Sequence, residues 1–176
     1  MLVCAIGGLA LVQPIIKEYP STLDNPDQVA GLSKLEDPQL RRLIDQLSAQ
    51  LRSSVGTTDT VAAVYAPTGD PTRMVMLFAG TKLVLDPGKV LDSAFQGFAK
   101  GAGPSLSDVH DVPPGPLGGL TRCGSSTLVA GGTTLPLAGC AWADHGSFGM
   151  VLFFNRPAAE SEKLFGQVRA AVLRRG

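Results

Sequence analysis

Three stretches of the chain repeat apolar residues with the period of an α-helix. The first follows Asp37-Pro38, where Asp is a good N-cap and Pro suits the first helical turn. The second follows Asp86-Pro87, which repeats this start, and the third begins near Pro157. Spacings of three and four residues place the apolar side chains of each stretch on one face, which predicts three amphipathic helices. These side chains are Leu40, Leu43, Ile44, Leu47 and Leu51; Val90, Leu91, Ala94, Phe95 and Phe98; and Leu164, Phe165, Val168 and Val172.

Short runs of β-branched and aromatic residues between these helices predict strands. Residues 61–66 and 74–79 are two such runs, joined by PTGDPTR, which is rich in turn formers. Residues 106–112 predict a third strand, which leads into the exposed loop PPGPLGG. The segments that follow, as far as residue 154, predict hairpins. We therefore expect an antiparallel sheet of about six strands.

The dipeptide Gly131-Gly132 separates TLVA from TTLPL and is typical of a two-residue hairpin turn. Such a turn sets the register, because opposed residues must then have numbers that add up to 263. Cys123 and Cys140 meet this condition and fall at a non-hydrogen-bonded pair, where Cα atoms lie ~4.5 Å apart. Pro136 falls where its missing N–H costs the pairing nothing. We predict a Cys123–Cys140 disulfide, which would indicate an oxidising compartment.

Other interpretations of the cysteines stay open. A bulge at Gly124 or Ser125 would shift the register by one residue. The two thiols could be free and buried, as in a cytosolic protein. They could also bind zinc with His110 and His145, although the chain lacks the short Cys and His spacings of zinc sites. We expect no metal and no cofactor, and Cys4 is not expected to join the disulfide.

The sequence CAWADHGSFG brings together Asp144, His145 and Ser147, the residue types of a hydrolase triad. His145-Gly146 also suits a second two-residue turn, because both residues tolerate a left-handed backbone. Asp144 would then face Ser147, and the His145 side chain would point to solvent. A triad needs its histidine between the acid and the serine. We therefore interpret this stretch as a hairpin and expect no catalytic residue.

A smaller polar group lies in SDVHDV. Strand alternation puts Asp108 and His110 on one face, where they could bind a cation weakly. We interpret the group as an ordinary solvated strand face, with the weak cation site as the alternative.

Two stretches of the chain look alike. VAAVYAP and RMVMLF, followed by a helix, resemble AGCAWAD and FGMVLFF, also followed by a helix. Tyr65 then matches Trp142, which the second turn places over Gly149. The similarity indicates either two ββα units or a chance likeness between two core hairpins.

The first twelve residues, MLVCAIGGLALV, are apolar throughout. This is shorter than the roughly 20 residues that span a bilayer, so we interpret residues 1–16 as the end of a membrane-anchor or signal-like segment; a short buried element is the alternative. Residues 17–36 are expected to form an extended tether, and residues 37–176 a single domain.

The charge content excludes one class of partner. Fifteen basic residues balance fifteen acidic ones, the pI is near 6.7, and no Lys/Arg run indicates a nucleic-acid-binding surface. The 44 % of hydrophobic residues is too high for disorder. The chain should therefore form a globular domain that does not bind nucleic acid.

The string DVHDVPPGPLGGLTRCG, followed by CAWADHGSFGMVLFF and a final amphipathic helix, resembles uncharacterised actinobacterial proteins with a membrane segment and an extracytoplasmic domain. The resemblance implies a location on the outer side of the cell membrane, but it implies no activity. The order of the elements is similar to that of Mog1/PsbP-like lipoprotein domains, by analogy only.

Together these features predict an α+β fold, an antiparallel sheet with three helices packed on it. The expected function is non-enzymatic: a membrane-tethered extracytoplasmic domain that binds a partner protein or cell-envelope component. The alternative is a carrier of a small apolar ligand or lipid, held in a cavity between the sheet and the helices.

Overall fold

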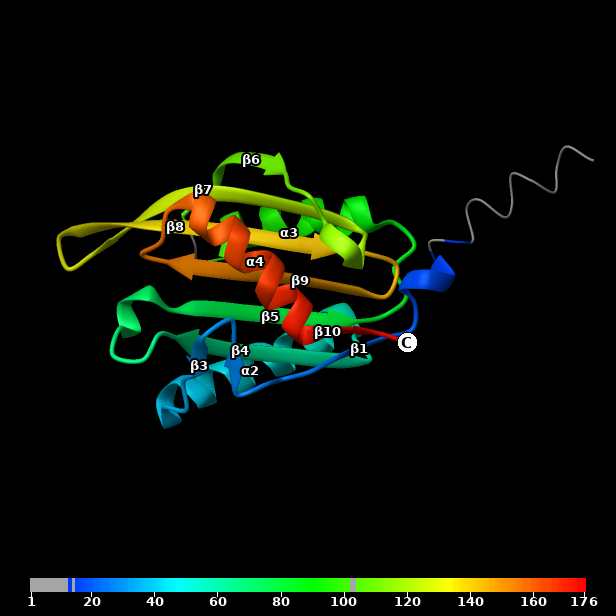
Figure 1. Cartoon of the computed structure of the whole chain (residues 1–176), viewed down its shortest axis with the longest axis horizontal. Helices are drawn as coiled ribbons and strands as arrows, with labels where there is room; N and C mark the ends of the chain where they lie inside the picture. Colours follow the sequence, from blue (N-terminus) through cyan, green and yellow to red (C-terminus); the bar gives the residue numbers. More distant parts are fainter. Residues whose placement is uncertain (1–12, 14, 102–103) are drawn as a thin grey trace, which may run out of the picture.

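An eight-stranded antiparallel sheet runs through the molecule, with strands in the order β2-β3-β4-β5-β9-β8-β7-β6 (Figure 1). The computed structural model describes residues 13, 15–101 and 104–176. A second, two-stranded sheet pairs β1 with β10. The strands are β1 (Ser21–Leu23), β2 (Gln28–Val29), β3 (Leu32–Lys34), β4 (Asp59–Ala66), β5 (Val75–Thr81), β6 (Ser107–Asp111), β7 (Leu120–Ala130), β8 (Thr133–Ala143), β9 (Ser147–Phe154) and β10 (Leu173–Arg175).

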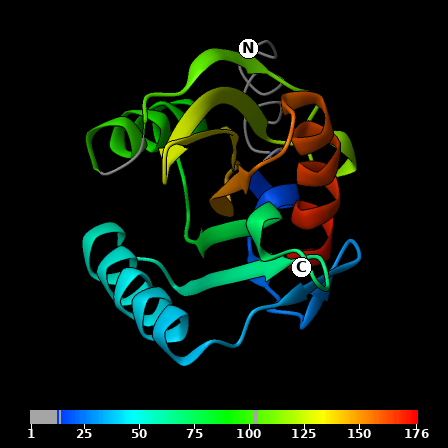
Figure 2. The same ribbon diagram turned by 90° about the vertical axis from the view of Figure 1, so that its left-hand side faces the viewer.

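Helices cover both faces of the large sheet. Helices α2 (Pro38–Val55) and α3 (Pro87–Gly101) lie on one face, and α4 (Ala158–Val172) lies on the other (Figure 2). As predicted, Asp37 caps α2, its carboxylate accepting the N–H groups of Gln39 and Leu40. The expected α+β class and the three amphipathic helices are confirmed.

The two faces differ in how tightly they are packed. On the α4 face, Val75, Leu77, Val151 and Phe153 are fully buried together with the α4 residue Val168. On the other face, the side chains that alternate with these along β5 and β9 are half-buried for the most part: Met76, Phe78, Phe148, Met150 and Phe154. The α4 face therefore forms the main core.

The segment 17–36 differs from the expected tether, because it contributes three strands to the folded domain. β1 pairs with β10 at the chain's C-terminal end, and β3 pairs with β4. Ala30 and Gly31, both with positive φ, turn β2 into β3, so that Val29 and Leu32 are buried. Pairing and burial hold this segment on the domain despite its two prolines and mixed polarity.

The predicted N-terminal anchor, residues 1–16, lies almost wholly outside the described residues. Within the part of the chain that the structure does describe, no helix is long and apolar enough to cross a membrane.

The two similar stretches form neighbouring hairpins, β4–β5 and β8–β9, which meet through the pairing of β5 with β9. Tyr65 and Trp142 are both buried on the α4 face. The helices that follow the two hairpins, however, pack on opposite faces: α3 contacts Ala141 and Met150, whereas α4 contacts Trp142. Two equivalent ββα units are therefore not present.

The β7–β8 hairpin has the predicted register. Gly131 and Gly132 form the turn with φ values of 57° and 79°, and the pairing runs without a shift from Ala130↔Thr133 to Leu120↔Ala143. Cys123 faces Cys140 with Cα atoms 4.0 Å apart and sulfur atoms at bonding distance, in agreement with the expected bridge. The bulge considered at Gly124 is absent from this pair of strands.

Trp142 faces Gly149 across β8 and β9, as the second turn requires. A Cβ atom at position 149 would lie 2.2 Å from the indole ring. The ring fills this space and also contacts Phe165 of α4, with ring centroids 6.2 Å apart. Only glycine at 149 leaves room for a fully buried Trp142 in this position.

Candidate functional site

Asp144, His145 and Ser147 meet at the β8–β9 turn but do not form a triad. Asp144 and Ser147 are fully buried, and the Ser147 hydroxyl donates to Asp144 Oδ2 at 2.7 Å while it accepts from Trp142 Nε1 at 3.1 Å. The His145 ring lies on the other side, with Nδ1 2.8 Å from the carbonyl oxygen of Val84. The hydroxyl and the imidazole are therefore not brought together, as the hairpin interpretation predicts.

Two details predicted for this turn are wrong. The His145 side chain is half-buried against Val84 and does not point freely to solvent. Neither His145 nor Gly146 has a positive φ, so left-handed geometry is not the reason for glycine here. The reason is close contact, because a Cβ at Gly146 would lie 2.0 Å from the carbonyl oxygen of Glu18.

The Asp144 carboxylate organises a buried ionic cluster. Its Oδ1 accepts the backbone N–H groups of Gly146 and Ser147 at 2.9 and 2.7 Å. Its Oδ2 accepts from the guanidinium groups of Arg169 and Arg175 at 3.3 and 3.0 Å. Burial, which outweighs the attraction of Asp144, lowers the pKa of Arg169 to about 10. The carboxylate thus neutralises guanidinium charge inside the fold.

The two arginines also join segments that are distant in sequence. Arg169 donates to the carbonyl oxygens of Pro114 and Gly118 in the loop before β7, at 3.1 and 2.8 Å. Arg175 donates to the Glu18 carbonyl oxygen at 3.0 Å. Because Arg169, Arg175 and Asp144 bond one another and the backbone of these segments, we interpret the cluster as structural: it holds the loop and both terminal segments together. We call it the Asp144 clasp.

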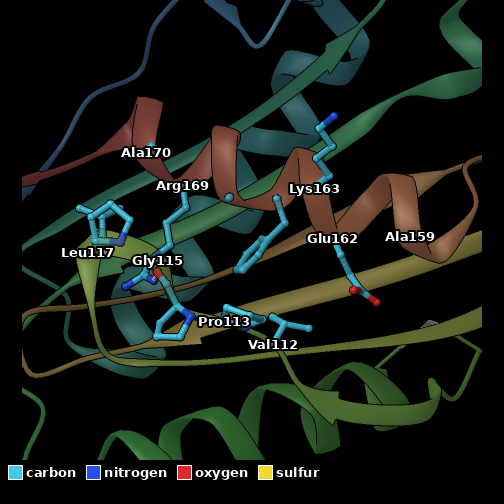
Figure 3. Close-up of a pocket in the computed structure, with 13 residues that line it drawn as sticks. Val112, Pro113, Gly115, Leu117, Ala159, Glu162, Lys163, Arg169 and Ala170 are labelled. Carbon is cyan, nitrogen blue, oxygen red and sulfur yellow. Dashed lines mark hydrogen bonds between the residues drawn. The ribbon is translucent and has the colours of Figure 1, made fainter.

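A pocket of about 500 Å³ lies beside this clasp, between α4 and the proline-rich loop (Figure 3). The guanidinium of Arg169 turns toward the loop, and Glu162 and Lys163 leave α4 in different directions. Val112 and Phe165 give the floor an apolar character. Among the described residues that line the pocket, no set of groups converges for acid–base or nucleophilic chemistry.

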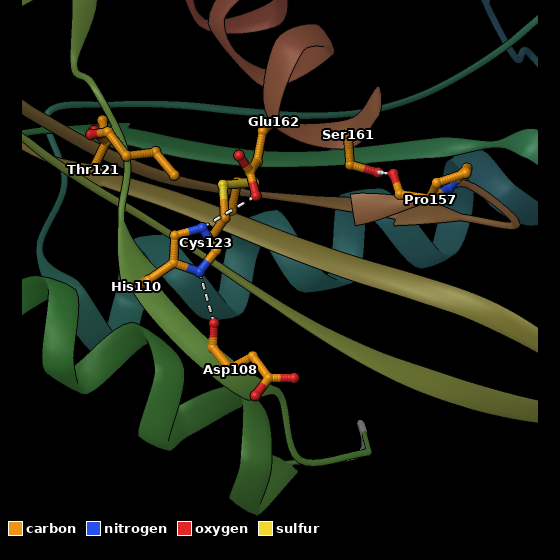
Figure 4. The surroundings of a disulfide bond; sticks show 9 residues. Asp108, His110, Thr121, Cys123, Pro157, Ser161 and Glu162 are labelled. Atoms are coloured by element: carbon orange, nitrogen blue, oxygen red, sulfur yellow. Dashed lines mark hydrogen bonds and ion pairs between the residues drawn. A yellow bond between two sulfur atoms is a disulfide. The ribbon is translucent and has the colours of Figure 1, made fainter. Parts of the chain in front are cut away.

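Asp108 and His110 lie on the exposed edge strand β6, near the paired cysteines (Figure 4). The register shifts between Ser107 and His110, and Asp108 takes a positive φ of 52°. His110 Nδ1 therefore bonds the Asp108 carbonyl oxygen at 2.7 Å, and Nε2 lies 3.2 Å from Glu162 Oε1. The bond to the Asp108 carbonyl, followed by the nearby Glu162, raises the pKa of His110.

The bulge gives both ring nitrogens of His110 partners other than the Asp108 carboxylate, so the weak cation site considered for Asp108 and His110 does not form as a pair of these side chains. Among the residues that the structure describes, no three His, Cys, Asp or Glu side chains come together as metal ligands would.

A second cavity, larger than the pocket beside α4, is an apolar groove between α2 and α3 of about 590 Å³. The two helices stand apart on the sheet face that they share (Figure 2), so side chains of β5 and β9 form the floor between them. We call this the α2–α3 groove. Its apolar lining comes from Val55, Phe78, Val90, Ala94, Phe98, Phe148 and Met150, among others.

Two residues of this groove have properties that sequence reasoning passed over. Gly97 lies within α3 on the groove wall, and a Cβ placed there would meet nothing within 4 Å. Lys82 is half-buried at the end of the groove where β5 and α2 end. The sequence signal for Gly97 is a glycine inside a strongly periodic helix, which lowers helix stability without a turn to justify it.

The groove is therefore the described cavity best suited to a ligand, whereas the Asp144 cluster holds the fold together. The sequence resemblance to actinobacterial extracytoplasmic proteins, and the analogy with Mog1/PsbP-like domains, stay predictions. In comparisons with known proteins the chain matches no protein-family model, no curated protein and no solved structure.

Proposed function

We propose that this chain is a non-enzymatic binding domain that holds a small apolar ligand in the α2–α3 groove. The observation that carries the proposal is the groove itself, about 590 Å³ in volume and lined mainly by aliphatic and aromatic side chains. Small-molecule sites typically enclose roughly 300–1,000 Å³ and are lined in this way. Of the two functions expected from the sequence, the groove favours the apolar-ligand carrier.

The contrast between the two sheet faces supports this choice. Leu77 and Val151 are fully buried under α4, yet their neighbours Phe78 and Met150 on the groove face are only half-buried. A ligand in the groove would cover these apolar side chains, and burial of apolar area contributes about 25 cal/mol per Å².

Gly97 supports the proposal independently. An interior helical glycine costs roughly 1 kcal/mol relative to alanine, and no neighbouring atom requires its small size. Because Gly97 lines the groove, we expect a larger side chain at this position to reach into it. The glycine therefore keeps volume open at the expense of helix stability.

The location of the domain is a further part of the proposal. The cysteine pair at bonding distance supports an oxidising, extracytoplasmic compartment, and the apolar run at residues 1–12 supports a membrane tether. Partition of the full-length product into a detergent phase is expected, and its recovery entirely in the aqueous phase would contradict the tether.

Replacing Gly97 with Leu should fill the groove and prevent binding. With the neutral apolar dye N-phenyl-1-naphthylamine as probe, we expect the fluorescence increase of the wild-type protein to fall at least tenfold. The free energy of unfolding should stay the same or rise by up to ~1 kcal/mol, because leucine is a better helix former than glycine.

The matched control is Gly166→Leu. Gly166 is also an exposed helical glycine where an added Cβ would meet nothing within 4 Å, but it lines the pocket on the α4 side. Dye binding should be unchanged in this variant. Loss of dye binding in G166L but not in G97L would place the ligand beside the proline-rich loop and overturn the groove proposal.

A second candidate function is contact with a partner protein through the outer part of the β7–β8 hairpin, residues 126–136. This ribbon projects from one end of the molecule (Figure 1), and no charged residue occurs between Arg122 and Asp144. Val129 is 71 % exposed, and β6 and β9 pair with the hairpin only as far as Ser125 and Leu137. Free strand edges without charges are suited to strand addition by an extended polypeptide.

Photocrosslinking tests the ribbon. A photoreactive residue at Val129, in cells that make the protein, is expected to give a discrete crosslinked species that the same residue at exposed Lys163 does not give. Equal labelling from both positions, or none from Val129, would contradict a partner site on the ribbon.

A further inference from the structure

From Lys82 we infer that the ligand of the α2–α3 groove is an amphipathic anion, an apolar chain or ring system that carries one carboxylate or comparable acidic head. This inference rests on the proposed function, because it concerns the ligand of the same groove. It adds the chemical class of the head group and its position at one end of the groove.

The two lysines of the groove lie at the same end. Lys82 follows β5 directly, and Lys89 lies near the start of α3. The same end holds Val55, the last residue of α2. The opposite part of the groove is lined by Gly97 and the rings and chains around it, without charge. The groove thus has a cationic end and an apolar body.

Lys82 is held in place but is not neutralised. Its ammonium group donates one hydrogen bond to the carbonyl oxygen of Val55, at 3.1 Å, and lies 5.9 Å from the centre of the Phe148 ring. Over the described residues, no carboxylate lies within 4.0 Å of it, whereas Lys89 is paired with Asp86 at 3.6 Å. An ammonium group has three donors, so two remain for a ligand.

The surroundings of Lys82 strengthen its attraction for an anion. The side chain is half-buried, and a charge next to apolar groups is screened less than one in bulk water. Because Asp86 pairs with Lys89, Lys82 is the groove lysine that has no carboxylate partner among the described residues. A ligand with its apolar tail against the groove lining and its acidic head at Lys82 would match both the apolar side chains and the charge of Lys82.

The test compares three ligands with the same twelve-carbon chain at pH 7.5: dodecanoate, dodecanol and dodecyltrimethylammonium, each by displacement of N-phenyl-1-naphthylamine. We expect dodecanoate to bind about tenfold or more tightly than dodecanol, as hydrogen bonds to charged groups typically allow. Dodecyltrimethylammonium should bind most weakly, because its head carries the same charge as Lys82.

Substitution of Lys82 isolates the head-group contact. Lys82→Met should remove the preference for dodecanoate and leave dodecanol affinity within twofold, which also shows that the groove is still folded. Lys82→Arg should retain the preference. Lys163→Met, on the opposite face of the sheet, serves as the charge-matched control and should change nothing.

The outcomes separate this inference from the proposed function. Equal binding of dodecanoate and dodecanol by the wild-type protein, or a preference that persists in K82M, would overturn the anionic head group while the apolar groove stands. Failure of all three ligands to displace the dye would overturn the groove as their site, and the inference with it.

Discussion

Replacing Asp144 with Asn is expected to destabilise the domain by about 3–5 kcal/mol, the range for removing one partner of a buried ion pair. Asparagine would keep the shape of the side chain but would leave Arg169, which is 1 % exposed, with an uncompensated charge. Arg175 would lose its carboxylate as well. Urea unfolding at pH 7 measures the effect.

Asp24→Asn provides the matched control for Asp144. Asp24 pairs with Arg174 at 2.9 Å, but both side chains are about half exposed, and exposed pairs contribute roughly 0–1 kcal/mol. We expect this variant to stay within that range. A loss below 1 kcal/mol in D144N would mean that the two guanidinium groups are neutralised without Asp144, and the clasp interpretation would be wrong.

Removing both cysteines, in Cys123→Ala/Cys140→Ala, is expected to lower the free energy of unfolding by about 2–4 kcal/mol. The bridge joins residues 17 positions apart, and closing a loop of this size is worth about 3 kcal/mol in the chain-entropy account. The fold should persist, because the two cysteines are only a small part of the α4-face core to which they belong and a domain of this size keeps its core. Comparison of urea unfolding for wild-type and C123A/C140A proteins measures the loss.

Peptide mapping of the natively produced protein without reductant tests the same bridge and the proposed compartment. The expected result is a Cys123–Cys140 cross-linked peptide with Cys4 unpaired. Two free thiols at positions 123 and 140 in freshly isolated protein would contradict both the bridge and the extracytoplasmic location.

The hairpins from residue 120 to residue 154 could be predicted in detail because short turns set their register. Once Gly131-Gly132 is the turn, the pairing of Cys123 with Cys140 follows from strand geometry alone. The same holds for Trp142 and Gly149 at the second turn. Local sequence is sufficient there, since every paired residue is near its partner in the chain.

The Asp144 clasp could not be predicted in the same way, because its members come from the two ends of the domain. Arg169 did carry a signal: with Phe165, Val168 and Val172 it completes a spacing of three and four residues along α4, so an arginine lies on the buried stripe. Its partner is set by tertiary structure. Arg175 lies beyond the end of α4, in the short strand β10.

The position of the groove could not be predicted from the sequence, for a different reason. The apolar stripe of α3 predicts that Phe98 is buried, but the stripe does not show how far α3 stands from α2. That distance depends on which strands each helix covers: α2 packs on β4, and α3 packs mainly on β8 and β7. β5 and β9 are left between them, and the groove follows from this arrangement.

The joint between β5 and β9 has a consequence for the order in which the chain can fold. The sheet consists of two halves that are continuous in sequence, β2 to β5 and β6 to β9, and only this joint connects them. The edge of β5 that pairs with β9 belongs to the segment VMLFAGT, which carries no charge. This edge stays unpaired until β9 has been synthesised. Each hairpin can form early because its contacts are local, whereas closure of the sheet needs contacts between distant residues. Until closure, the nascent chain presents an open apolar strand edge of the kind that promotes aggregation.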